Sequence, residues 1–200
     1  MVGSMAKKIT KIFLSASIPY QDEPFYNSTD VIAVRDSIKA LATVIIPKTQ
    51  LIWGGHPAIT PLIKEVYEKT NSPNIKDHVT IYQSRWFEGK YPKDNEIFGN
   101  IIYTEKRETL EESLSIMRKE MFENDFSVGI FIGGKQGIID EFEKFKIAFP
   151  EALILPVAST GGATKKVYED YITKHEFNDQ LRADYAYMSL FKTLLKNYIE

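Results

Sequence analysis

Short apolar runs alternate along the chain with stretches in which apolar residues recur at helical spacing. The runs are KIFLSAS (11–17), TQLIWGG (49–55), HVTIYQS (78–84), IFGNIIYTE (97–105), SVGIFIGG (127–134) and ALILPVAST (152–160). Runs of this length that end in small or polar residues are typical of buried strands. The pattern therefore predicts strands that alternate with helices.

Capping residues mark the starts of the predicted helices. Asp30 and Thr60 stand at N-cap positions, and Pro61 suits the first turn of the second helix. Thr109 and Glu112 have the spacing of a capping box. The apolar faces are expected to contain Val31, Val34, Ile38 and Leu41; Leu62, Ile63, Val66 and Tyr67; Leu110, Leu114, Met117 and Met121; Ile138, Phe142, Phe145 and Phe149; and, in one tail helix from Ala183, Tyr185, Met188, Phe191, Leu195 and Tyr198.

Near-continuous apolar strands separated by helices predict an α/β fold in which a mainly parallel sheet is covered on both faces. Residues 1–4 (MVGS) are interpreted as a vector remnant, and residues 5–200 as one domain. Residues 85–96 are too irregular to assign, and their role stays open.

Composition excludes several classes of function. The net charge of −2 gives no electrostatic footprint for nucleic acid, so a DNA-binding role is disfavoured. Without cysteine there is neither a disulfide nor a thiolate metal site, and no histidine pair has metal-ligand spacing. No apolar run approaches the length of a membrane span, and no secretion signal follows Met5. We expect a cytoplasmic protein without metal or cofactor.

Small residues follow the predicted strands at four places. They are Ser15, Ala16 and Ser17; Gly54, Gly55 and His56; Gly133, Gly134, Lys135 and Gly137; and Ser159, Thr160, Gly161 and Gly162. Ligands of parallel sheets bind at the carboxyl ends of the strands, where glycine permits close approach and free N–H groups favour anions. A double glycine also serves any tight turn, but four such turns on one edge favour a nucleotide-like ligand. None of them has the GK[ST] or GxGxxG spacing of an ordinary ATPase or NAD dehydrogenase.

The segment MRKEMFENDFSVGIFIGGKQGIIDEF resembles the signature of the SLOG superfamily, which includes the LOG-type phosphoribohydrolases that activate cytokinins. In the LOG enzymes an Arg-Lys pair on a helix precedes a strand that ends in PGGxGTxxE. The matching positions here are Arg118, Lys119, Met121, Gly133, Gly134, Gly137 and Glu141. FLSAS and LIWGGHPAI are similar to the first strand and the earlier glycine turn of the family. The resemblance implies a Rossmann-like three-layer α/β/α fold.

The segment also departs from the LOG motif. Ile132 replaces the proline before the double glycine, one extra residue precedes Gly137, and Ile138 replaces a threonine that helps to hold phosphate. Met117 replaces the glutamate before the Arg-Lys pair. These departures make the chain similar to divergent SLOG members of bacterial conflict systems, which are thought to bind or process nucleotide-derived signals.

The resemblance implies catalytic roles for Glu141 and Arg118. A carboxylate near the ribose stabilises an oxocarbenium-like centre or activates water, and a guanidinium binds phosphate. The alternatives from the residues alone are a solvated first-turn glutamate and an exposed helix charge.

Other polar residues are candidates for ligand contacts. His56 is expected to donate to phosphate or to serve in proton transfer, the alternative being a capping or loop histidine. Lys135 is expected to neutralise an anion or to face solvent. The hydroxyls of Ser15, Ser17, Ser159 and Thr160 are expected to bond ribose or phosphate. Arg85, with neighbouring aromatic residues, either holds a base or belongs to a loop or subunit contact.

Two hypotheses follow. In the first, the protein binds a nucleotide or a nucleotide-derived molecule, such as an NAD-derived or cyclic signal, as a sensor or sequestering module in bacterial or phage conflict. In the second, it is an N-glycosidic hydrolase or transferase that uses Glu141 and Arg118. The altered motif favours the first. Resemblance to LOG proteins also implies a homo-oligomer, most simply a homodimer.

Overall fold

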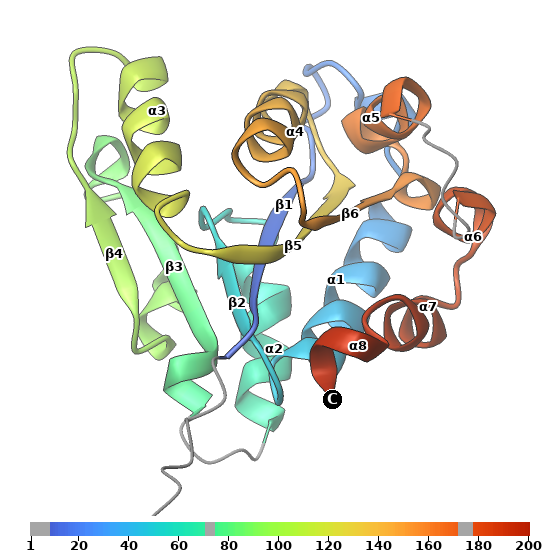
Figure 1. Ribbon diagram of the computed structural model, residues 1–200. Helices are drawn as coiled ribbons and strands as arrows, with labels where there is room; N and C mark the ends of the chain where they lie inside the picture. The colour runs from blue at the N-terminus through green and yellow to red at the C-terminus, as the bar shows by residue number, and fades with distance from the viewer. Residues whose placement is uncertain (1–8, 71–74, 172–177) are drawn as a thin grey trace, which may run out of the picture.

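The computed structural model describes residues 9–70, 75–171 and 178–200 (Figure 1). The strands are β1 (Lys11–Ser17), β2 (Gln50–Trp53), β3 (Val79–Ser84), β4 (Ile101–Thr104), β5 (Phe126–Gly133) and β6 (Leu153–Val157). The α-helices are α1 (Val31–Ile45), α2 (Thr60–Lys69), α3 (Leu110–Met121), α4 (Gln136–Ala148), α5 (Gly162–Tyr171), α6 (Asn178–Ala183), α7 (Tyr187–Leu194) and α8 (Lys196–Ile199). The 3-10 turns are η1 (Tyr26–Ser28), η2 (Ile75–His78), η3 (Arg85–Phe87), η4 (Lys93–Ile97) and η5 (Ala158–Thr160). Residues 1–4, interpreted above as a remnant, lie outside the described residues.

The six strands form one sheet in the order β4-β3-β2-β1-β5-β6, and every neighbouring pair is parallel. From β1 the chain winds outward in one direction to β4 and then returns to place β5 on the other side of β1. The winding therefore reverses between β1 and β5. Such a reversal opens a crevice at the carboxyl ends of the two strands, which is where doubly wound sheets bind ligands.

Two apolar layers cover the sheet, which confirms the predicted three-layer α/β architecture. On one face α1, α2 and α7 pack on side chains that include Ile12, Leu51 and Ile130. On the other face α3, α4 and α5 pack on side chains that include Phe13 and Phe131. Among the described residues, no helix is both long and apolar enough to cross a membrane.

A cluster of phenylalanines holds α4 on the sheet. The fully buried ring of Phe145 stacks on Phe13 with centroids 5.1 Å apart and meets Phe131 edge-on at 6.0 Å. Gly129 in β5 makes room for it, since a Cβ there would lie 2.5 Å from Phe145 Cε1. The position of α4, and of the side chains that it carries, therefore depends on this packing.

Several local predictions are confirmed. Asp30 caps α1 by accepting a hydrogen bond from the Ala33 N–H at 2.9 Å. Thr109 and Glu112 form both hydrogen bonds of the capping box at the start of α3.

Three other local predictions, on Thr60, Leu110 and the tail, are wrong. Thr60 is the first residue of α2 instead of its cap, because the His56 carbonyl already accepts from the Ile59 and Thr60 N–H groups. Leu110 is 40% exposed, since the first turn of α3 stands beyond the strand ends (Figure 1). The tail is several helices, and Asp184 Oδ1 accepts from the Ala186 N–H to form the turn before α7.

The phenylalanine cluster gives a stability prediction. Phe145→Ala should lower the free energy of unfolding by about 3–5 kcal/mol, because it removes a fully buried ring and leaves a cavity under α4. Ile147→Ala on the same helix removes a side chain that is 77% exposed and should change stability by no more than about 0.5 kcal/mol. Chemical denaturation of both variants checks the difference; equal losses would contradict it.

Candidate functional site

The turn that follows β5 lies against the end of β1. Ser17 and Gly133 are paired in the parallel register, and Gly133 and Gly134 have φ values of 60° and 85°. A Cβ on Gly134 would lie 1.9 Å from Ile138 Cδ1 and 3.1 Å from Ser17 Oγ, so the turn has no room for a side chain. We call this region, at the winding reversal, the switch-point site.

Glu141 joins three elements at this site. Its carboxylate accepts a hydrogen bond from Ser15 Oγ of β1 at 2.5 Å and one from Arg118 Nε of α3 at 3.0 Å. The side chains of Arg118 and Glu141 are only 12% and 18% exposed. Gly137 adjoins the pair, since a Cβ there would lie 3.6 Å from an Arg118 Nη atom. Both charges are therefore held in place, and the alternatives of a solvated glutamate and an exposed arginine are excluded.

Lys135 is paired with a carboxylate that the sequence pattern did not single out. Lys135 Nζ donates to Glu23 Oε1 at 2.7 Å and lies 5.3 Å from the centroid of the Tyr20 ring. Glu23 also accepts from the Tyr20 N–H at 2.8 Å. The bond from Lys135, followed by that from Tyr20, holds the pKa of Glu23 below its usual range. Residues 18–29 have no periodic pattern, so no signal in the sequence marked this contact.

His56 follows the β2 turn and lies within electrostatic reach of Lys135 and Glu23. Burial, followed by the positive charge of Lys135, lowers its pKa from 6.5 to about 4, while Glu23 opposes the shift. Its Nδ1 accepts from the Ala58 N–H at 3.2 Å, so the ring is held as a neutral acceptor. The β2 turn is thus electrostatically coupled to the Lys135–Glu23 pair at the β5 turn.

Gln83, at the end of β3, supports the β2 turn and was not predicted. A Cβ on Gly55, whose φ is 46°, would lie 1.6 Å from Gln83 Nε2. Gln83 is 4% exposed, and within the described part of the chain its Nε2 has no hydrogen-bond partner. Gly55 is therefore required by the packing of this amide. Gly54 adjoins α3, where a Cβ would meet Met117 Cε at 3.1 Å.

The hydrogen-bonding groups of the turn after β6 are bonded mainly to other groups of the chain. Thr160 Oγ1 accepts from the Gly133 N–H at 2.8 Å and donates to the Val157 carbonyl at 2.6 Å. The Gly161 N–H donates to the Ala158 carbonyl, and a Cβ on Gly161 would lie 2.0 Å from the Ser28 carbonyl oxygen. These groups fix the turn itself.

Two further contacts complete the β6 turn. Gly162 has a φ of 64°, and a Cβ on it would lie 2.8 Å from the Gly134 carbonyl oxygen. Ser159 Oγ lies 3.1 Å from Tyr187 Oη, and burial raises the pKa of Tyr187 to about 12. The β6 turn therefore acts as a brace for the β5 turn and connects it to α7.

The side chains of Arg85 and Ala16 make no contact with the two ion pairs described above. Arg85 lies in η3, pairs with Glu88 at 3.2 Å and stacks over Tyr103 of the edge strand β4. Its strand, β3, is separated from β1 by β2. Ala16 lies in β1 opposite Ile132 and packs against the apolar layer of α1.

The first turn of α4 is the part of the switch-point site best suited to an anion. Lys135 is the N-cap residue and makes no side-chain capping bond. In α4 the Ile138 N–H already donates to the Lys135 carbonyl at 2.9 Å, whereas the N–H groups of Gln136 and Gly137 have no acceptor among the described residues, and the helix dipole makes this end attractive to negative charge. In the parts of the chain that the structure describes, no three His, Asp or Glu side chains gather as a metal site would require.

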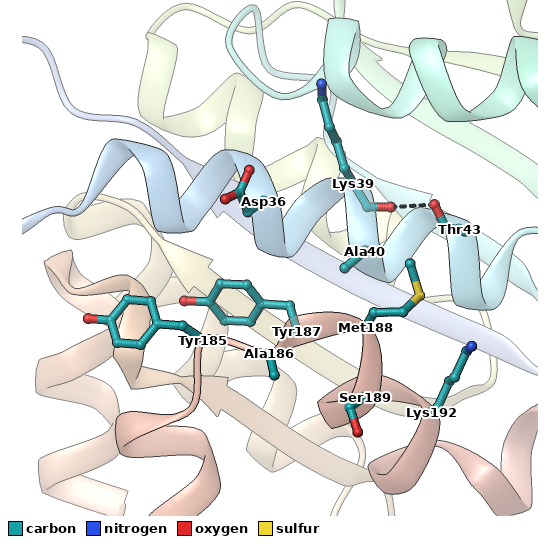
Figure 2. A pocket seen from close by; sticks show the side chains of 10 residues that line it. All are labelled: Asp36, Lys39, Ala40, Thr43, Tyr185, Ala186, Tyr187, Met188, Ser189 and Lys192. Carbon is teal, nitrogen blue, oxygen red and sulfur yellow. Dashed lines mark hydrogen bonds between the residues drawn. The ribbon is translucent and has the colours of Figure 1, made fainter.

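A separate groove lies between α1 and α7, and Figure 2 shows its side chains. Its volume is about 690 Å³, and it is lined by Asp36, Lys39, Ala40, Thr43, Tyr185, Ala186, Tyr187, Met188, Ser189 and Lys192. None of the residues predicted to bind a ligand lines it.

The burial of His56 and its neighbouring charges predict the pKa of its imidazole and a pH dependence of stability. Its imidazole resonances should titrate near pH 4, and Lys135→Met should raise that pKa by removing a neighbouring positive charge. Because the unfolded chain protonates His56 near pH 6.5, the free energy of unfolding should fall as pH drops from about 6.5 to about 4 and level off below. NMR titration measures the pKa, and His56→Gln should lack this part of the pH dependence; a pKa near 6.5 would contradict the prediction.

The fold and the family of the chain are shown by its similarity to known proteins. The crystal structure of TM1055, a target of the Northeast Structural Genomics Consortium, superimposes with a TM-score of 0.57 at 14% identity, covering 86% of this chain and 89% of that one. That likeness shows the fold. No curated protein sequence matches the chain. The model of the SLOG cluster3 family matches residues 24–195, which include the turns after β2, β5 and β6 and the Arg118–Glu141 pair. The chain therefore belongs to the SLOG cluster3 family.

Proposed function

We propose that the protein binds a nucleotide or a nucleotide-derived small molecule at the switch-point site and acts as a cytoplasmic sensor or sequestering module. The observation that carries this proposal is the uncapped first turn of α4, which stands at the winding reversal beside Lys135 and the Arg118–Glu141 pair. Amide groups and cations at this place suit a phosphate or pyrophosphate. The resemblance to conflict-system SLOG proteins suggests an NAD-derived or cyclic signal.

Binding would begin with the ligand's anionic group at the start of α4. Lys135 is 33% exposed and bonded to Glu23, so an incoming phosphate would compete with the Glu23 carboxylate for its ammonium. Ser17 Oγ lies beside Gly134, and in this proposal it donates to the same anion. The Thr160 hydroxyl already accepts from Gly133 and donates to Val157. We therefore assign Thr160 the role of holding the turn.

A second function, cleavage of an N-glycosidic bond, is favoured by the contacts of Glu141. The Arg118 guanidinium and the Ser15 hydroxyl keep this carboxylate in one orientation at the sheet edge. A fixed, charged carboxylate can stabilise the positive charge that develops at the ribose C1′ as the bond to the base breaks. Water then adds to C1′, and the base departs with a proton.

One experiment separates the two functions. Nucleoside monophosphates, NAD and ADP-ribose are incubated with the wild type and with Glu141→Gln, and thermal stabilisation and free base are both measured. Binding to the native state raises the melting temperature by mass action. A sensor is expected to show stabilisation by one ligand class without base release.

The outcome with Glu141→Gln assigns the role of the carboxylate. Base release that Glu141→Gln abolishes would establish the hydrolase instead. Glu143→Gln, which changes a side chain on α4 that is 54% exposed, is the matched control and should behave as the wild type. Neither stabilisation nor release by any of these compounds would contradict both functions.

Competition between Glu23 and the ligand gives a further prediction. Glu23→Gln should bind a phosphate-bearing ligand about 1.4- to 5-fold more tightly, because an exposed ion pair that must be broken is worth roughly 0.2–1 kcal/mol. Lys135→Met should weaken binding. Asp22→Asn, at an exposed neighbouring position, is the control. Isothermal titration calorimetry measures the affinities; unchanged affinity in Glu23→Gln would place the phosphate elsewhere.

A further inference from the structure

The edge strand β4 offers backbone groups that have no partner within the sheet. It is one of the two terminal strands, and in the described part of the chain it is paired only with β3 (Figure 1). Edge strands are protected by short length, charges, prolines or bulges, and of these β4 has only its short length of four residues. Residues Ile101–Thr104 include no charge and no proline, and Ile102 and Tyr103 are 38% and 42% exposed. This edge therefore has the properties of an unpartnered pairing surface.

The hydrogen bonds between β3 and β4 show which backbone groups are free for a partner. The Ile81 N–H donates to the Asn100 carbonyl at 2.9 Å, and Ile81 is paired with Ile101 in the parallel register. Alternate residues of a parallel strand direct their backbone groups to the same neighbour. The backbone groups of Asn100 and Ile102 face β3. The N–H and C=O groups of Ile101 and Tyr103 therefore point away from the sheet.

We infer that β4 pairs antiparallel with β4 of a second copy of this chain, about a two-fold axis through Ile102. The register follows from the outward groups: Ile101 of each copy exchanges its N–H and C=O bonds with Tyr103 of the other. The two Ile102 residues then form a non-hydrogen-bonded pair, in which side chains lie closest. The result is a continuous sheet across both copies.

Charge complementarity supports this register. It places Gly99 of one copy opposite Glu105 of the other. The stem of Lys76 covers Gly99, since a Cβ there would lie 3.1 Å from Lys76 Cδ. Among the described residues no carboxylate pairs with Lys76, whereas Glu105 is 66% exposed and bonded only to Arg107 within its own segment. Each Glu105 thus meets a free Lys76 at either end of the paired strands.

The ring of Tyr103 is already held in place for this contact. It packs on Tyr91 with centroids 5.2 Å apart, and Arg85 lies 5.4 Å from its centroid. This gives the irregular segment 85–96 a structural role in supporting the edge. A four-residue strand buries less area than the roughly 1,200 Å² of a stable interface, so the dimer should depend on concentration.

A single cysteine tests the register, because the chain has none of its own. In Ile102→Cys the two thiols would stand on the axis, where the Cα separation of about 4.5 Å falls within disulfide range. Mild oxidation should therefore convert the protein to a covalent dimer. Glu108→Cys, beyond the strand, should stay monomeric under the same treatment. Equal cross-linking of both variants would show random collision and overturn the inference.

A charge swap tests the pairing without oxidation. In Ile102→Lys, and in Ile102→Glu, like charges would meet on the axis, so each protein alone should be monomeric by sedimentation at concentrations where the wild type dimerises. An equal mixture should form a heterodimer. Melting temperatures near that of the wild type show that both variants fold. A wild type that stays monomeric at high concentration, or a dimer that Ile102→Lys leaves intact, would overturn the inference.

Discussion

The switch-point site depends on the contact between two turns, the one after β5 and the one after β6. Thr160 Oγ1 accepts from the Gly133 N–H, and the Ala163 N–H donates to the Gly134 carbonyl at 3.0 Å. These bonds hold a backbone with positive φ at Gly133 and Gly134, which only glycine adopts readily. Because α4 starts directly after this turn, the same contact fixes where Lys135 and Glu141 stand relative to β1.

The charges around this turn are balanced inside the chain. Arg118 is paired with Glu141, Lys135 with Glu23, and His56 is kept neutral by burial and by Lys135. The two pairs differ in exposure, since Arg118 and Glu141 are largely covered and Lys135 and Glu23 are about one-third exposed. Breaking the covered pair would leave a largely buried charge without its partner, so this pair favours a fixed arrangement of Arg118 and Glu141. The exposed pair can exchange partners at little cost, and an arriving anion would meet it first.

The sequence predicted the sheet, its order of elements and the turn residues because these depend on local periodicity and on glycine. It also placed Glu141 and Arg118 in one motif, and the structure brings them together. Glu23, Tyr20 and Gln83 were missed, since their contacts join segments without any periodic pattern. Arg85 was grouped with the ligand-binding residues by its aromatic neighbours in the sequence, yet its side chain lies over Tyr103 of the β4 edge, which packs on Tyr91. The amino-acid composition of a loop does not show which strands of a sheet the loop packs against.

Two of the departures from the LOG motif, Ile132 and Ile138, place apolar side chains in the core. Ile132 is fully buried and paired with Val157, so β5 continues as a hydrogen-bonded strand up to the glycines, where a proline would lack the N–H that such a strand donates. Ile138 is buried against Gly134, in the place where the LOG enzymes have a threonine. Where the LOG motif that this segment resembles has a hydroxyl, the helix start here has apolar packing. If the protein binds an anion there as proposed, Ser17 and Lys135 are the polar side chains left at the helix start to contact it, and Glu141 decides whether binding is followed by chemistry.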